Sequence, residues 1–114
     1  MIPTEAQEAK VFVAYLRLKG HRFMHIPSET GSSAEARRRA IRMKQQGTSR
    51  GFPDYLLIVK NQLAAVELKR IKGSKTTPEQ LEWLTALRAA GVPGIVAKGA
   101  KEAIEFVEKL EVTH

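Results

Sequence analysis

The stretch PDYLLIVKNQLAAVELK, residues 53–69, decides the fold, because it joins a fully apolar strand to a second strand through a short turn. Tyr55–Val59 (YLLIV) is a continuous apolar run, which is typical of a strand covered on both faces. Lys60 and Asn61 are a turn signal, and residues 63–69 return as a second strand. We therefore predict a β-hairpin in the middle of the chain.

Two acids and a lysine accompany this hairpin. Asp54 precedes its first strand, and Glu67-Leu68-Lys69 lies at the end of its second strand. Successive side chains of a strand point to opposite faces, so Glu67 and Lys69 share one face, opposite to Val66 and Leu68. An ordinary exposed ion pair on an edge strand is the alternative interpretation of Glu67 and Lys69.

The register of the hairpin decides whether Asp54 joins this face. A two-residue turn pairs Val59 with Gln62 and therefore Asp54 with Glu67, whereas a shift by one residue sends Asp54 to the opposite face. Two adjacent carboxylates repel each other, and such a pair normally holds a hard cation or a shared proton. The neighbouring Lys69 supplies a positive charge that suits phosphate oxygens.

The rest of the chain alternates between helical and strand periodicity. Thr4 and Thr77 begin capping boxes with Gln7 and Gln80, and Gly20 is a helix stop signal. We predict helices over residues 4–20, 34–46, 77–91 and 100–110, and further strands over residues 22–26 and 95–97. The order α-β-α-β-β-α-β-α describes an α/β fold in which a small mixed β-sheet is flanked by helices, as one domain over residues 1–114.

Composition excludes several classes of protein. Hydrophobic residues make up 43% and charged residues 27% of the 114 residues, which rules out a disordered chain. No apolar run approaches the roughly 18–20 residues that span a bilayer, and the N-terminus lacks the pattern of a secretory signal. The absence of cysteine excludes disulfides and thiolate metal sites. We therefore expect a cytoplasmic protein with no membrane partner.

The positive charge is concentrated in one segment. The net charge is +7, and residues 36–53 account for +6 of it because they contain six Lys and Arg residues and no acid. Such a local excess is typical of a surface that binds a phosphate backbone, although a solvated helix face is the alternative. The candidate DNA-binding residues are Arg37, Arg38, Arg42, Lys44 and Arg50.

The pattern Pro53-Asp54 … Glu67-Leu68-Lys69 resembles the signature of the PD-(D/E)XK nuclease superfamily. Longer stretches of the chain resemble the small VRR-Nuc branch of this superfamily. They are TEAQE (4–8), KQQGTSRGFPDYLLIV (44–59), AAVELKRIKG (64–73) and TPEQLEWLTALRAAG (77–91). Members occur as stand-alone phage-type domains and as modules of larger repair enzymes. The resemblance implies a restriction-endonuclease-like fold, in agreement with the predicted element order, and a bacterial or phage-infected host cell.

The resemblance also implies roles for individual residues. Asp54 and Glu67 are then metal ligands, together with the main-chain carbonyl of Leu68, and Mg²⁺ or Mn²⁺ is the cofactor. Lys69 would orient the attacking water or neutralise the charge that develops on phosphorus.

Two further residues of the site come from helices. The family uses an acid of the first helix, and helical phase turns both Glu5 and Glu8 inward, of which we favour Glu8. Gln80 matches a helix glutamine that lies near the metal in the family, but its capping box explains it equally well. Trp83 is predicted to belong to the core and not to a platform that stacks on bases.

The predicted function is that of a metal-dependent, structure-selective DNA endonuclease that hydrolyses phosphodiester bonds. Branched DNA such as a four-way (Holliday) junction is the favoured substrate. A homodimer is expected, because two sites related by a two-fold axis match the symmetry of a junction. The alternatives are a catalytically silent DNA-binding module and a nuclease that nicks plain duplex or flap DNA.

Overall fold

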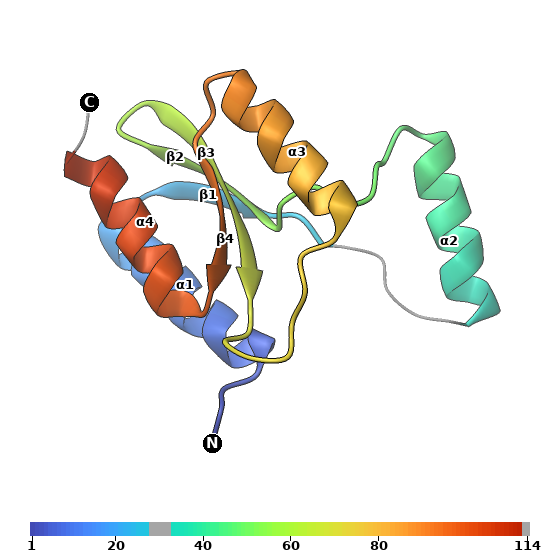
Figure 1. Ribbon diagram of the computed structural model, residues 1–114, viewed down its shortest axis with the longest axis horizontal. Coiled ribbons are helices and arrows are strands. Elements are labelled where there is room, and N and C mark those ends of the chain that lie inside the picture. The colour runs from blue at the N-terminus through green and yellow to red at the C-terminus, as the bar shows by residue number, and fades with distance from the viewer. Residues whose placement is uncertain (28–32, 113–114) are drawn as a thin grey trace.

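The computed structural model describes residues 1–27 and 33–112, which form a four-stranded sheet with helices on both faces (Figure 1). The elements are α1 (Glu5–Lys19), β1 (Arg22–His25), α2 (Ala34–Gln45), β2 (Tyr55–Val59), β3 (Gln62–Lys69), α3 (Pro78–Ala89), β4 (Gly94–Lys98) and α4 (Ala100–Val112). The predicted order is confirmed, and strand ends differ by one residue. No helix in the two described ranges is long and apolar enough to cross a membrane.

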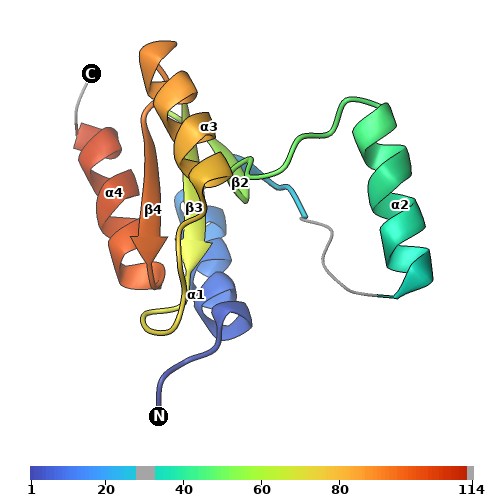
Figure 2. The ribbon, with the colours of Figure 1, turned by 45° about the vertical axis from the view of Figure 1, so that its right-hand side comes forward.

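The strands lie in the order β1-β2-β3-β4. The pairs β1–β2 and β2–β3 are antiparallel, whereas β3 and β4 are parallel and are connected through α3. Helices α1 and α4 cover one face of the sheet, and α3 lies on the other (Figures 1 and 2). The sheet is therefore mixed and covered on both sides, as predicted.

The turn between β2 and β3 has the geometry that fixes the hairpin register. Lys60 and Asn61 both have positive φ angles, 52° and 66°. Two such residues make a type I′ turn, whose twist matches that of the flanking strands. The strands consequently pair Val59 with Gln62 at the turn. The two-residue turn is confirmed, and the register shifted by one residue is excluded.

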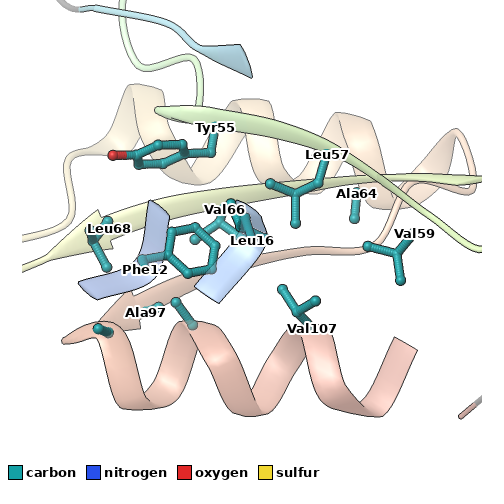
Figure 3. Packing of buried hydrophobic residues seen from close by; sticks show 12 residues of the cluster. Phe12, Leu16, Tyr55, Leu57, Val59, Ala64, Val66, Leu68, Ala97 and Val107 are labelled. Carbon is teal, nitrogen blue, oxygen red and sulfur yellow. The ribbon is translucent and has the colours of Figure 1, made fainter. Parts of the chain in front are cut away.

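The hydrophobic core lies between the sheet and the pair α1 and α4 (Figure 3). Phe12 of α1 meets the ring of Tyr55 edge-on, with the ring centroids 5.3 Å apart. Full burial of one such large apolar side chain contributes about 1.5–3 kcal/mol to folding. The other large buried residues of this cluster are Leu16, Leu57, Val59, Val66, Leu68 and Val107. This face of the sheet is therefore structural, which leaves the opposite face for polar residues.

Helix α2 stands apart from the sheet in both views (Figures 1 and 2). Ser33 caps its start by accepting a hydrogen bond from the backbone N–H of Ala36, and Ala36 is its only buried residue. Among the described residues, α2 packs extensively against no other helix or strand. An open groove of about 1340 Å³ separates α2 from α3. The sequence predicted this helix, but not that it would stand off from the rest.

Candidate active site

Asp54 and Glu67 lie side by side on the face of the sheet that α3 covers. Tyr55 pairs with Val66, so the next pair along these antiparallel strands places Asp54 opposite Glu67. Asp54 Oδ2 accepts a hydrogen bond from the backbone N–H of Leu68 at 3.2 Å, which holds the carboxylate against β3. The hairpin turn thus brings together two acids that lie thirteen positions apart in the sequence.

Glu67 is almost completely buried, with 5% of its surface exposed. Its Oε2 accepts a hydrogen bond from Gln80 Nε2 at 3.0 Å and lies 3.4 Å from Lys69 Nζ. Its Oε1 is buried and has no hydrogen-bond partner among the described residues. Burial, and then the negative charge of Asp54, raise the pKa of Glu67 to about 7, against the opposing effect of Lys69.

The pKa of the Asp54 carboxyl group is also raised. Burial raises its pKa above the ordinary value, and the negative charge of Glu5 raises it further, while the hydrogen bond from Leu68 lowers it. Two neighbouring carboxyl groups with raised pKa values favour a proton or a cation between them. This arrangement separates the pair from an ordinary exposed ion pair on an edge strand, because β3 is a central strand.

Gln80 both caps the start of α3 and contacts the candidate site. Its Oε1 accepts a hydrogen bond from the backbone N–H of Thr77 at 2.9 Å, and its own backbone N–H donates to Thr77 Oγ1, so the predicted capping box is present. Its Nε2 simultaneously donates to Glu67. The two interpretations of Gln80 that the sequence left open are therefore compatible, because each uses a different atom of the amide.

The two acids of α1 differ in their surroundings. Glu5 is exposed, and its negative charge contributes to the raised pKa values of Asp54 and Tyr55. Glu8 is buried, and its Oε1 accepts a hydrogen bond from the backbone N–H of Ala100 at the start of α4, at 3.1 Å. Its Oε2 is buried without a hydrogen-bond partner among the described residues, whereas Glu5 is exposed, so only Glu8 faces inward as expected and the preference for Glu8 as the metal ligand stays a prediction.

The loop before Asp54 rests directly on α3. A Cβ atom at Gly51 would lie 2.5 Å from the backbone carbon of Glu79, and Gly51 has a φ of +86°, so only glycine fits here. The ring of Phe52 packs edge-on against Trp83 at 4.8 Å. Sequence reasoning missed Gly51 and Phe52, although a glycine two residues before Pro53-Asp54 is a signal of close backbone approach. Trp83 is half-buried, so it supports this loop instead of lying in the core.

The predicted DNA-binding residues lie away from this pair of acids. Four belong to α2, and Arg50 belongs to the loop that leads from α2 towards Asp54. All five are exposed, and they are Arg37, Arg38, Arg42, Lys44 and Arg50. The structure thus places the basic segment on a helix that stands apart from the sheet (Figure 2).

The donors around Asp54 and Glu67 fit a hard divalent cation. Among residues 1–27 and 33–112, no group of three or more His, Cys, Asp or Glu side chains is arranged to hold a metal ion. The fit rests on two carboxylates and one main-chain oxygen, namely Asp54, Glu67 with its partnerless Oε1, and the carbonyl of Leu68. Because the N–H and C=O of one residue leave a strand on the same side, the Leu68 carbonyl points towards β2, as its N–H does.

Comparisons with known proteins agree with the fold. The family model described as the VRR-NUC domain matches residues 4–101. A solved structure titled "VRR_NUC domain protein" is similar, with a TM-score of 0.76 and 22% identity, over 95% of this chain and 88% of that one. Another, titled "VRR_NUC domain", has a TM-score of 0.66 and 20% identity, over 93% and 97% of the two chains. No curated protein matches the chain.

Proposed function

Since the chain belongs to the VRR-NUC domain family, whose fold is that of nucleases that process DNA, we propose that it hydrolyses DNA phosphodiester bonds with the help of Mg²⁺ or Mn²⁺. The residues that would hold the cation are Asp54 and Glu67, with the main-chain carbonyl of Leu68, and Glu8 of α1 stays the further predicted ligand.

One observation carries the proposal, namely that the buried carboxyl group of Glu67 lies beside the half-buried carboxyl group of Asp54. Glu67 Oε1 has no partner within the described residues, and the pKa of Glu67 is raised to about 7. Leaving a buried acceptor unsatisfied costs about 1–3 kcal/mol, which a structural site would avoid. Carboxylate and carbonyl oxygens are the ligands that Mg²⁺ and Mn²⁺ prefer.

The remaining residues of the site supply positioning and charge. When bound, a divalent cation would supply neutralisation of charge on the scissile phosphate and a lowered pKa for a water ligand. Lys69 keeps its ammonium group 3.4 Å from Glu67 Oε2, where it can contact a phosphate oxygen as negative charge develops. Gln80 holds Glu67 in one orientation through the 3.0 Å hydrogen bond from Nε2.

DNA is the proposed substrate, and branched DNA such as a four-way junction is the proposed favoured form. The exposed arginines of α2 provide attraction to phosphates over a distance, independent of DNA sequence. A domain of 114 residues offers one site and little surface with which to recognise a branch. Two copies related by a two-fold axis would present two sites with the symmetry of the junction.

Helix α2 supports the proposal of a homodimer. Ile41 is 58% exposed, and it lines the groove between α2 and α3 together with Met43. The α3 side of this groove carries Glu79 and Glu82, which complement the basic residues of α2 in a second copy. Light scattering should therefore give a dimer that Ile41→Asp dissociates. The matched control is Leu18→Asp on α1, which changes a residue that is 84% exposed outside the groove and should leave the dimer intact.

A cleavage assay tests the proposed activity. Duplex, flap, splayed and four-way DNAs are incubated with the protein in Mg²⁺, in Mn²⁺ and in EDTA. We expect cleavage only with a divalent cation, and fastest cleavage of the four-way junction. Binding of DNA without cleavage of any substrate would refute the nuclease and favour a silent DNA-binding module, whereas equal cleavage of plain duplex would refute selectivity for branches.

A further inference from the structure

A pair of lysines lies next to the pair of acids, one strand further along the sheet. Strands β3 and β4 are parallel, and their register places Val96 beside Glu67 and Lys98 beside Lys69. Partner residues on neighbouring strands point to the same face, and the strands lie about 4.8 Å apart. Ala97, between Val96 and Lys98, belongs to the core on the opposite face. Lys98 therefore projects from the face that carries Glu67 and Lys69.

Helix α3 leaves this end of the face open. Gln80 in its first turn contacts Glu67, and the helix then runs back along the sheet, so that Leu84 packs against Gly94 at the start of β4. Lys98 lies at the other end of β4, and the two views show the ends of β3 and β4 side by side (Figures 1 and 2). The side chain of Lys98 is consequently exposed.

The charge of Lys98 is not balanced within the protein. Like charges that face each other on neighbouring strands repel, and Lys69 has Glu67 Oε2 3.4 Å from its Nζ. Lys98 forms no ion pair within residues 1–27 and 33–112, and the nearby Glu102 accepts a hydrogen bond from its backbone N–H instead, at 2.8 Å. Two adjacent ammonium groups favour an anion beside them, and a phosphate group has several charged oxygens to offer.

The connection between β3 and α3 adds positive charge at the same end of the sheet. Residues 70–77 contain Arg70, Lys72 and Lys75 and no acid, and all three side chains are exposed. We call these three residues and Lys98 the basic edge. It adjoins the candidate active site directly, whereas α2 stands apart from the sheet (Figure 2). The basic edge is therefore placed to contact a DNA strand whose scissile phosphate lies at the two acids.

We propose that Lys98 is a substrate-binding residue, which holds a phosphate neighbouring the scissile phosphate, while Lys69 acts on the scissile phosphate itself. The basic edge then continues the path of the same DNA strand away from Asp54 and Glu67. Such contacts position the backbone and read no base, so they apply to plain and branched DNA alike. The inference rests on the proposed function, because only a nuclease has a scissile phosphate. The attraction of Lys98 to the DNA backbone does not depend on cleavage.

DNA binding in EDTA tests this contact without catalysis. The affinity for a fluorescein-labelled duplex and for a labelled four-way junction is measured by anisotropy at a series of salt concentrations. Lys98→Gln should bind both DNAs several-fold more weakly and lower the slope of log K against log salt concentration by about 0.9, as expected for one phosphate contact. Lys98→Arg keeps the charge and should keep the slope. The matched control is Lys109→Gln, which removes an exposed lysine from α4, behind the opposite face, and should change neither value.

Cleavage kinetics separate Lys98 from Lys69. Lys98→Gln should raise KM several-fold and leave kcat nearly unchanged, whereas Lys69→Ala should lower kcat. A loss of kcat as large as that of Lys69→Ala would place Lys98 at the scissile phosphate, and an unchanged salt slope would place it in solvent; either result overturns the proposal. The Tm of DNA-free Lys98→Gln should not fall, because the substitution removes one of two like charges. A fall would make Lys98 a structural residue and would also overturn the proposal.

The two proposals fail in different ways. If no DNA were cleaved with Mg²⁺ or Mn²⁺, the nuclease and with it the neighbouring position of the Lys98 phosphate would be refuted. The salt slope in EDTA would still decide whether Lys98 binds a DNA phosphate, since that measurement needs neither a cation nor cleavage.

Discussion

Glu67→Gln should stabilise the metal-free protein at pH 8 and have little effect at pH 5. The pKa of Glu67 rises from its ordinary value of 4.5 to about 7 in the folded protein, first because of burial and then because of Asp54. Below pH 4.5 the group is protonated in both the folded and the unfolded state. Between pH 4.5 and 7 the unfolded chain releases its proton first, so the free energy of unfolding falls as the pH rises and is lowest above 7.

The magnitude follows from the same values. The difference between 4.5 and about 7 corresponds to roughly 3 kcal/mol, at about 1.4 kcal/mol per pH unit. An amide keeps an acceptor oxygen for Gln80 but gives up the 3.4 Å ion pair with Lys69. We therefore expect a net gain on the order of 2 kcal/mol at pH 8, or a rise in Tm of about 8–16 °C.

Thermal unfolding in EDTA from pH 5 to pH 8 measures this effect. Glu105→Gln is the matched control, because it makes the same change at an exposed acid of α4. Mn²⁺ should then stabilise the wild-type protein at pH 8 and leave Glu67→Gln unaffected, since a ligand stabilises only a state that binds it. A Tm for Glu67→Gln that follows the wild type at every pH would refute the burial of an unbalanced charge at this site.

Three further outcomes are expected. Lys69→Ala should lower the cleavage rate by about 10²–10³-fold, measured at saturating DNA, while Mn²⁺ affinity by calorimetry is kept. Thr77→Ala and Gln80→Ala should both lower the free energy of unfolding by about 1 kcal/mol, because each removes the capping box. Only Gln80→Ala should also weaken Mn²⁺ binding, because of these two residues only Gln80 contacts Glu67. Alanine substitutions at Arg37, Arg38 and Arg42 should weaken the salt dependence of DNA binding. The slope of log K against log salt concentration should fall by about 0.9 for each phosphate contact removed. An unchanged slope would show that α2 faces away from DNA.

Local sequence rules predicted the centre of the fold, because the contacts that build it are short-range. Lys60 and Asn61 alone set the register that places Asp54 opposite Glu67. The capping boxes at Thr4 and Thr77 were likewise visible, since each is completed within four residues. Such features need only turn chemistry and side-chain alternation.

Long-range contacts account for what the sequence could not predict. Helical phase predicted that Glu5 and Glu8 both face inward, but Glu5 is exposed, whereas Glu8 is buried and hydrogen-bonded to Ala100, 92 positions away. Gln80 required knowledge of where Glu67 lies before its second role could be assigned. The composition of α2 predicted a helix but not its separation from the sheet. The helix has only a narrow apolar stripe, and Ala36 is the one residue of α2 that is buried.

The candidate catalytic residues and the candidate DNA-binding residues lie in different parts of the structure. Glu67 and Lys69 lie on a central strand, where the hairpin turn and α3 fix them from either side. The basic segment lies on α2, which contributes one buried residue and little packing. At a concentration where the protein is monomeric, the free energy of unfolding should therefore respond to substitutions at Glu67 but not to Arg42→Ala. The salt dependence of DNA binding should respond to Arg42→Ala but not to Glu67→Gln. A variant of α2 that lowered Tm as much as one in β3 would show that the helix packs against a second copy in solution, because only burial in a partner would make it matter to stability.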